Sequence, residues 1–262
     1  MIYAKVILFL FSLTTLSAFA EESIDKGYRL PGETVIKDYK LMKLTPEKSA
    51  LASHIVKINY KIEKRMALEI AHNILSVSAC FRIDPWVLTG LIQKESSFNK
   101  DAVSPTNAAG LTQFTSSGLK EVNDQLGFRG REGATENATL YFTSKIKDCV
   151  DPSWVDLWVR INLPETDPEF YRQLKEEIKR DIPTAITYGA ILLKTYVGFI
   201  DSKSSRSTAE EDIDLPTSEI YFRALQIYNG EDGEAKVNYA KNVFKNLQGF
   251  YPNTINFPFL AD

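Results

Sequence analysis

The sequence predicts a mainly α-helical protein, and two observations carry that prediction. Apolar residues recur at helical spacing over long stretches, and residues 47–78 contain neither glycine nor proline. An aspartate followed by a proline stands at 84–85 and again at 167–168, where the carboxylate can cap free N–H groups and the proline suits the first helical position. With 44% hydrophobic residues and no internal repeat, we expect one principal domain.

The expected helices follow from these signals in chain order. Thr45-Pro46-Glu47 begins a helical stretch that reaches residue 78, with a break near residue 60 because helices of over thirty residues are unusual. A helix opens at Trp86, and shorter ones are expected at 117–126 and after Asp167-Pro168. The remaining helices are expected at 184–198 and from Thr217 to Tyr228.

The first 20 residues have the features of an export signal. Lys5 precedes the apolar run VILFLF, and residues 18–20 form a small-x-small cleavage site. The run is shorter than the roughly 20 residues that a membrane span needs. We therefore expect an exported protein, periplasmic or secreted, without a membrane anchor after cleavage. Residues 21–60 would form an N-terminal arm and helix, and 61–262 the main domain.

Charge and cysteine content narrow the possible functions. The formal net charge of −3 gives no basic surface for nucleic acid. His54 and His72 lie far in sequence from any residue with metal-ligand spacing, so we expect them on helix surfaces and expect no metal site. The export signal favours a disulfide between Cys80 and Cys149, the only cysteines, over two buried thiols.

Glu95 occupies an unusual position in the helix after Asp84. It continues the apolar stripe of Leu88, Leu91 and Ile92 at i, i+3, i+4 and i+7. Serines follow it, so it lies near the helix end, where the helix dipole and desolvation both oppose ionisation. Such a glutamate can donate a proton near neutral pH. The alternative is a helix-end glutamate that bends out to solvent.

Three motifs follow in close order from Glu95: ESSF at 95–98, AVSP at 102–105 and GLTQ at 110–113. This stretch resembles the goose-lysozyme-like lytic transglycosylases, the soluble lytic transglycosylase (SLT) domain family, whose pattern runs ESxF, AVSP and GLMQ. Three pieces with the family's order and gaps are more specific than one short motif. Later stretches resemble the family as well, namely residues 184–198, YNG at 228–230 and YAxxV at 239–243.

The resemblance implies a helical catalytic domain of the α+β lysozyme-like superfamily, with a glycan-binding cleft and a helical insertion at about 125–181. It implies cleavage of the MurNAc-GlcNAc β-1,4 bond of peptidoglycan with formation of 1,6-anhydro-MurNAc ends. Glu95 would serve as acid and then as base, with no cofactor. The implied substrate-binding residues are Ser104, Gly110, Leu111, Gln113, Thr115, Tyr228, Asn229 and Tyr239.

Individual roles also follow from the resemblance. Ser104 and Gln113 would bind the N-acetyl and neighbouring groups, and Tyr228 would donate a hydrogen bond to Glu95. Thr115 stands where the family has a methionine that lines a sugar subsite. The other departures are Asn107 for glycine, Thr112 for methionine, and Ser116 for proline.

Three segments outside the motifs have sequences that favour particular structures. Trp154 and Trp158, in the insertion, are expected to pack an added helix onto the core. Residues 201–216 are expected to be a surface loop. The aromatic tail, residues 249–262, is expected to dock as an extended strap.

Two other functions are compatible with the sequence. A lysozyme-type muramidase would need a second acid, such as Asp101 or Asp151, to hold a water. A catalytically silent peptidoglycan-binding scaffold is the other, which the departures at Thr112 and Thr115 allow. We expect a monomer whose partners are peptidoglycan glycan strands and possible cell-wall machinery.

Overall fold

The computed structural model describes residues 36–41, 45–126, 136–149, 163, 167–204, 215–230, 233–248, 250 and 257–260. The expected signal, the two tryptophans of the insertion and Asp151 lie outside these residues. The described part is mainly helical, which confirms the predicted fold class. Its helices are α2 (Lys48–Ile58), α3 (Lys64–Phe81), α4 (Pro85–Ser96), α5 (Ser116–Leu126), α6 (Glu136–Cys149), α8 (Pro168–Arg180), α9 (Ile182–Ser204), α10 (Thr217–Asn229), α11 (Glu234–Leu247) and the short 3-10 helix η3 (Pro258–Leu260).

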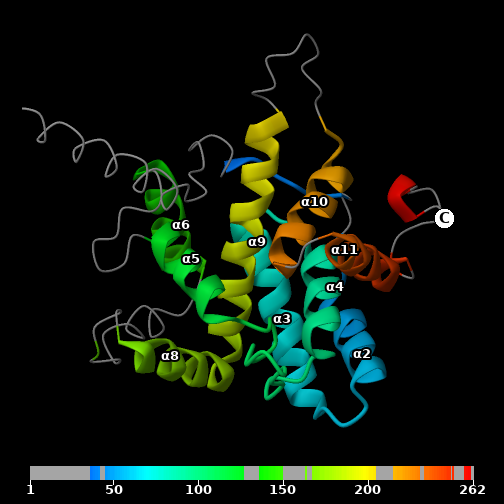
Figure 1. The fold of residues 1–262 in the computed structure, drawn as a ribbon. Helices are drawn as coiled ribbons and strands as arrows, with labels where there is room; N and C mark the ends of the chain where they lie inside the picture. The colour runs from blue at the N-terminus through cyan, green and yellow to red at the C-terminus, as the bar shows by residue number, and fades with distance from the viewer. Residues whose placement is uncertain are drawn as a thin grey trace, which may run out of the picture.

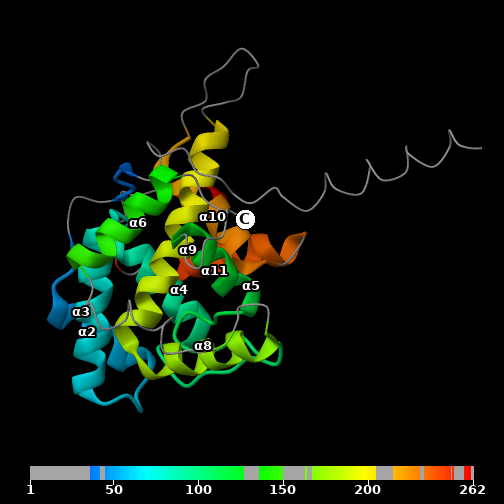
Figure 2. The same ribbon diagram turned by 90° about the vertical axis from the view of Figure 1, so that its left-hand side faces the viewer.

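The long helix α9 runs through the middle of the molecule (Figure 1). Its side chains are buried on nearly every side, which is typical of a helix that protein surrounds. Helices α3 and α10 pack directly on it, and α5 and α8 pack against it as well. Helices α5, α6 and α8 gather on one side of α9, while α2, α4 and α11 lie on the other (Figures 1 and 2).

The helix ends agree largely with the sequence signals. Asp84 caps α4 by accepting hydrogen bonds from the N–H groups of Trp86 and Val87, and α4 begins at Pro85, one residue earlier than predicted. Asp167 caps α8 in the same way. Helix α2 begins at Lys48, just after the predicted start at Thr45-Pro46-Glu47, and the side chain of its cap residue Glu47 makes no capping hydrogen bond.

The end of α9 corrects the first four residues of the predicted loop at 201–216, and residues 205–214 lie outside the described residues. The helix continues to Ser204, and Asp201 is buried within it. Asp201 accepts a hydrogen bond from the Tyr39 hydroxyl at 3.0 Å and pairs with Lys37 at 3.0 Å. These contacts of Asp201 with Tyr39 and Lys37, which are distant in sequence, explain why the polar residues 201–204 remain helical.

Residues 36–41, which we call the N-terminal strap, lie across the ends of α3, α4 and α9. The Lys194 amine of α9 is fully buried and donates to the Lys37 carbonyl at 2.6 Å. Its nitrogen also lies 4.4 Å from the centre of the Tyr39 ring. Burial lowers the pKa of Lys194 to about 7. The backbone N–H of Leu41 donates to Asp84, so the strap is joined to the cap of α4.

The described end of the tail packs on the last two helices. Phe259 stacks on Phe222 of α10, with ring centres 4.1 Å apart, and meets Phe244 of α11 edge to face. Phe257 is buried against the same Phe244. The predicted docking of the tail is therefore confirmed for residues 257–260, of which Pro258–Leu260 form a 3-10 helix rather than an extended strap. Residues 249, 251–256 and 261–262 of the tail lie outside the described residues.

Candidate active site

Glu95 lies at the carboxyl end of α4, as its place in the sequence predicted. The helix ends at Ser96, and Ser97 adopts the left-handed conformation with φ of 50°. The Glu95 side chain is mostly enclosed but not sealed from solvent. The apolar residues of its stripe are fully buried: Leu88, Leu91 and Ile92.

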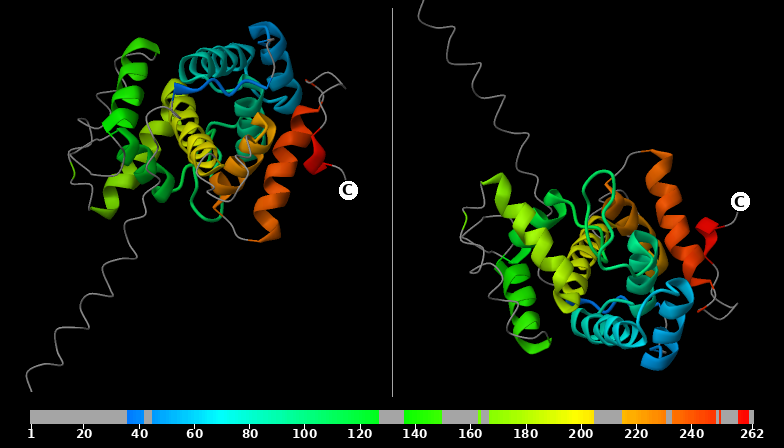
Figure 3. Two further views of the ribbon diagram at one scale, coloured as in Figure 1. Left: turned by 90° about the horizontal axis from the view of Figure 1, so that it is seen from above. Right: turned by 90° about the horizontal axis from the view of Figure 1, so that it is seen from below.

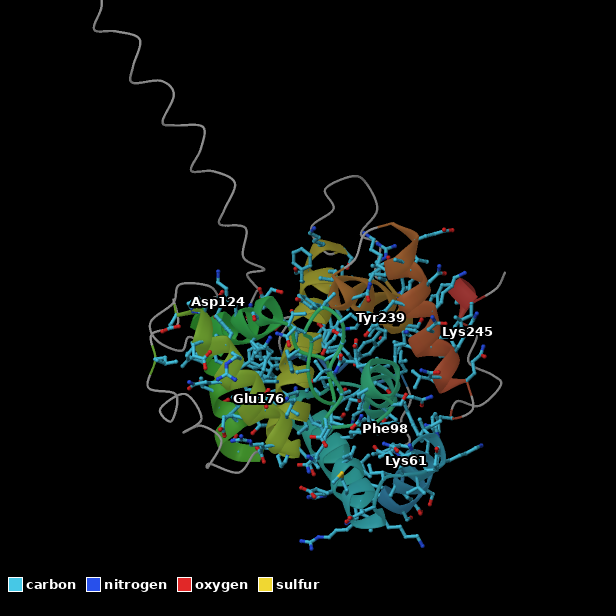
Figure 4. The ribbon with its side chains drawn as sticks, turned by 60° about the horizontal axis from the view of Figure 1, so that its bottom comes forward. Lys61, Phe98, Asp124, Glu176, Tyr239 and Lys245 are labelled. Atoms are coloured by element: carbon cyan, nitrogen blue, oxygen red, sulfur yellow. The ribbon has the colours of Figure 1, made fainter. Side chains whose placement is uncertain are left out.

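Helix α11 approaches α4 closely because Gly90 has no side chain. A β-carbon at Gly90 would lie 2.6 Å from Leu247 Cδ2 and 3.1 Å from the Val243 carbonyl oxygen. This contact brings Tyr239, one turn before Val243, next to the end of α4 (Figure 4). There the Tyr239 hydroxyl donates a hydrogen bond to Glu95 Oε1.

The surroundings of Glu95 change its acidity. Burial raises the pKa of Glu95 from 4.5 to about 7, against the opposing effects of the Tyr239 hydrogen bond and the Lys94 charge. A carboxyl group with this pKa holds its proton near neutral pH and can donate it to a bound molecule.

Tyr228 lies near Glu95 but does not donate to it, which corrects our prediction. Its hydroxyl donates to the carbonyl of Thr112 at 3.1 Å, and the tyrosine that donates to Glu95 is Tyr239. Burial and the negative charge of Glu95 raise the pKa of both tyrosines. Asn229 is the last residue of α10 and is partly buried.

The turn after α4 is held from behind by α2. Ser97 and Phe98 both have positive φ, and the Phe98 ring is fully buried. His54 contacts this ring edge to face, with centres 6.2 Å apart, and its Nε2 lies 2.8 Å from Gln93 Oε1. His54 is therefore partly buried and supports the turn, whereas we had expected a helix-surface residue. Burial also lowers the pKa of His54.

Residues 99–115, which we call the motif loop, fold back on themselves beside α4 (Figure 3, right). The N–H of Gly110 donates to the Ala102 carbonyl at 2.9 Å. The Gln113 side-chain amide donates to the carbonyls of Ala102 and Gly110 at 3.1 and 2.9 Å. Gly110 and Gln113 have φ of 78° and 48°, so the glycine serves a left-handed turn. These bonds fix the shape of the loop.

Ser104 and Thr115, which we expected to bind substrate, also accept hydrogen bonds from backbone N–H groups of the motif loop and of α5. Ser104 Oγ accepts a hydrogen bond from the N–H of Ala108 at 3.0 Å. Thr115 Oγ1 accepts from the N–H of Gly118 at 3.1 Å and so caps α5. Thr115 is exposed and Leu111 is buried, so Leu111 supports the loop from below.

Thr112 explains why α9 has a glycine, Gly189, near its middle. A β-carbon at Gly189 would lie 2.6 Å from Thr112 Cγ2, so the glycine of α9 makes room for the motif loop and not for another helix. The Thr112 hydroxyl donates to the Ala185 carbonyl at 3.3 Å. The methyl group of Thr112 therefore packs against Gly189 of α9, and its hydroxyl bonds the α9 backbone.

Asp84 and Asp101, two acids near Glu95 in the sequence, have contacts of their own. Asp84 caps the opposite end of α4, and Asp101 is exposed and pairs with Lys100 at 2.9 Å. Asp151 is outside the described residues. Within the described residues, no three histidine, cysteine or acidic side chains are grouped so that they could hold a metal ion.

The cysteines lie on two helices that pack together, α3 and α6. The Cys80 sulfur is buried and lies 3.4 Å from the carbonyl oxygen of Lys145, one turn before Cys149 on α6. The Cys149 side chain is outside the described part, and the disulfide stays a prediction.

Comparison with known proteins identifies one family. Residues 72–148, less than a third of the chain, match the family described as the transglycosylase SLT domain. No curated protein and no solved structure matches the chain significantly. Of the helices in the described ranges, none combines the length and apolar character needed to cross a membrane. The match contains Glu95 and the whole motif loop, so it confirms the resemblance to SLT transglycosylases and indicates lytic transglycosylase activity on peptidoglycan in general.

Proposed function

We propose that this protein is a lytic transglycosylase that cleaves the MurNAc-GlcNAc β-1,4 bond of peptidoglycan and leaves 1,6-anhydro-MurNAc ends. The observation that carries the proposal is Glu95, a mostly buried acid with a pKa of about 7 that accepts a hydrogen bond from Tyr239. The match to the SLT domain over residues 72–148 supports the substrate class.

In the proposed reaction Glu95 acts twice. Its carboxyl proton passes to the glycosidic oxygen as the bond from that oxygen to C1 of MurNAc breaks, while the N-acetyl carbonyl oxygen of the same sugar bonds to C1. The Glu95 carboxylate then takes the proton of the C6 hydroxyl, whose oxygen displaces the N-acetyl oxygen from C1. No water is consumed, and Glu95 recovers its proton.

The neighbours of Glu95 have separate roles in this proposal. Tyr239 holds one carboxyl oxygen, so the other oxygen faces the glycosidic bond. Ser104, Gly110 and Gln113 form the subsite for MurNAc, and the buried Leu111 supports it from below. The hydrogen bonds of Ser104 and Gln113 within the loop preserve its shape. Tyr228 supports the backbone at Thr112, and Thr115 and Asn229 lie at the edges of the subsite.

Analysis of the products by mass spectrometry tests the reaction. The mature protein is incubated with purified peptidoglycan, and we expect muropeptides that end in 1,6-anhydro-MurNAc. Reducing ends as the main product would identify a lysozyme-type hydrolase, and no digestion of several peptidoglycan types would favour a scaffold. Of the two acids considered for the hydrolase, Asp101 is exposed and paired with Lys100, and Asp151 lies outside the described residues.

We also propose that the chain acts outside the cytoplasm after cleavage at residue 20. The predicted signal and the peptidoglycan substrate both support this location. Intact mass of the exported protein tests the cleavage: a mature chain that begins at Glu21 is expected, and a chain retaining Met1 after export would contradict it.

A further inference from the structure

Helix α8, at the end of the expected insertion, lies directly against the motif loop. The Lys175 amine donates to the carbonyl of Asn107 at 3.2 Å. A β-carbon at Gly110 would lie 3.5 Å from Lys179 Cγ and 4.0 Å from its Cα, so the backbones also approach. In Figure 4, Glu176 marks α8 on one side of the loop and Tyr239 lies on the other. The loop is thus enclosed between α8 and α11.

Lys175 is buried although it is a lysine on a strongly charged helix. Only 8% of its surface is exposed, and burial lowers its pKa. A buried ammonium group is costly unless it is hydrogen-bonded, and the Asn107 carbonyl supplies an acceptor. The face of α8 that carries Lys175 is fixed to the core by buried apolar side chains at Phe170, Leu174 and Ile178.

The acceptor belongs to the most exposed turn of the motif loop. Residues 105–107 are exposed, and Asn107 has a φ of 62°. Inside the turn, the N–H of Asn107 donates to the Ser104 carbonyl and the N–H of Ala108 donates to Ser104 Oγ. The bond from Lys175 comes from outside the loop and connects this turn to a fixed helix.

We propose that α8 is a support for the glycan-binding loop and that Lys175 is its positioning residue. This inference rests on the proposed function for its effect on glycan binding. Without the Lys175 bond, the turn at 104–108 opens more often and Ser104 leaves its place in the MurNAc subsite. Glu95 is held by Tyr239 on the other side of the loop, so proton transfer continues. Glycan binding therefore weakens while turnover at saturation is preserved.

Three single substitutions in the full mature chain test this role. Lys175→Met keeps the length of the side chain and removes the donor, and Lys175→Arg restores a donor. The control is Arg172→Met, one turn earlier on α8, where an exposed guanidinium pairs only with the nearby Glu169 among the described residues. Their melting temperatures are compared first, and variants that melt together are carried forward.

Amide hydrogen exchange measures the support without any substrate. In Lys175→Met, the amides of Asn107 and Ala108 should exchange roughly ten-fold faster than in the wild type, because one hydrogen bond from a charged donor is lost. Lys175→Arg should restore slow exchange, and Arg172→Met should match the wild type. Unchanged exchange in Lys175→Met would overturn the proposal.

Steady-state kinetics on soluble glycan strands measures the effect on binding. We expect KM to rise several-fold in Lys175→Met with kcat nearly unchanged, and to return toward the wild-type value in Lys175→Arg. A fall in kcat with unchanged KM would exclude a role in glycan binding. If the wild type cleaves no glycan at all, the proposed function fails, yet the exchange data still decide whether Lys175 supports the loop.

Discussion

The Tyr239 hydroxyl donates a hydrogen bond to Glu95 Oε1, although the two residues are 144 positions apart in the chain. The bond joins α11 to the end of α4 at the point where Gly90 allows the two helices to approach. It also partly offsets the effect of burial on the pKa of Glu95. The two residues together therefore set both the position and the acidity of the proposed catalytic group.

Substitution of these residues should give a graded loss of activity. Glu95→Gln keeps the volume and removes the proton, so activity should fall by about ten thousand-fold or more. Tyr239→Phe should cost less, and Tyr228→Phe, which only supports the Thr112 backbone, should cost least. Release of muropeptides measures activity, and the exposed Tyr60→Phe is the control. A folded Glu95→Gln variant with most of its activity would disprove the assignment.

Activity should depend on pH through the protonation of Glu95. The acid form is required, so kcat/KM should be flat below about pH 7 and fall ten-fold per unit above it. The Tyr239 hydrogen bond lowers the pKa of Glu95, so Tyr239→Phe should move this decline to higher pH. A decline that moves to lower pH in Tyr239→Phe would contradict the geometry.

Stability should change over the same range of pH. The folded state holds the Glu95 proton up to about pH 7, while the unfolded chain loses it near its ordinary pKa of 4.5. Between these values the folded state binds more protons, so its free energy of unfolding falls as pH rises. Relative to Glu95→Gln, the wild type should lose up to about 3 kcal/mol from pH 4.5 to 7. Urea unfolding at several pH values measures the difference, and a constant difference would rule out a raised pKa.

The contact between Gly189 and Thr112 predicts that a destabilising substitution at one residue can be compensated by a substitution at the other. Gly189→Ala would place a methyl group 2.6 Å from Thr112 Cγ2 and should destabilise the protein by about 1–3 kcal/mol. Thr112→Ser removes that methyl group of threonine but keeps the hydroxyl that donates to Ala185. The double variant should therefore be more stable than Gly189→Ala alone. Additive losses in a double-mutant cycle would show that the two residues do not interact.

The cysteines should form a disulfide in the exported protein. The bond would close a loop of about seventy residues and contribute about 4 kcal/mol in the chain-entropy model. Thiol labelling of the unfolded, unreduced chain tests this directly. Two reactive thiols per chain would contradict the prediction, and Cys149→Ser would then melt like the wild type.

The sequence was most informative where a local rule decides the structure. Asp84 and Asp167 predicted the starts of α4 and α8, because caps depend on neighbours in the chain. The helix expected from Thr217 to Tyr228 is α10, which ends one residue later. Helical spacing likewise placed Glu95 on the apolar side of α4. These features need no knowledge of what packs against each helix.

Side-chain partners across the fold were not predictable in this way. Tyr239 rather than Tyr228 reaches Glu95, because the close approach at Gly90 decides which tyrosine faces α4. Lys175 and Lys194 are buried, although the sequence favours water for any lysine. Lys175 donates to one distant carbonyl oxygen and Lys194 to two, and no pattern in the sequence records those contacts.

The N-terminal strap has a consequence for the order in which the chain folds. Tyr39 is synthesised early, yet its hydroxyl donates a hydrogen bond to Asp201, which lies 162 positions further along the chain. Lys194 likewise reaches back 157 positions to the carbonyl of Lys37. Closing so long a loop is slow, because its entropy is lost before the contacts form. The strap can meet the ends of α3 and α4 soon after they are made, through Arg82 and Asp84. Its bonds to Lys194 and Asp201 can form only after α9 has been synthesised.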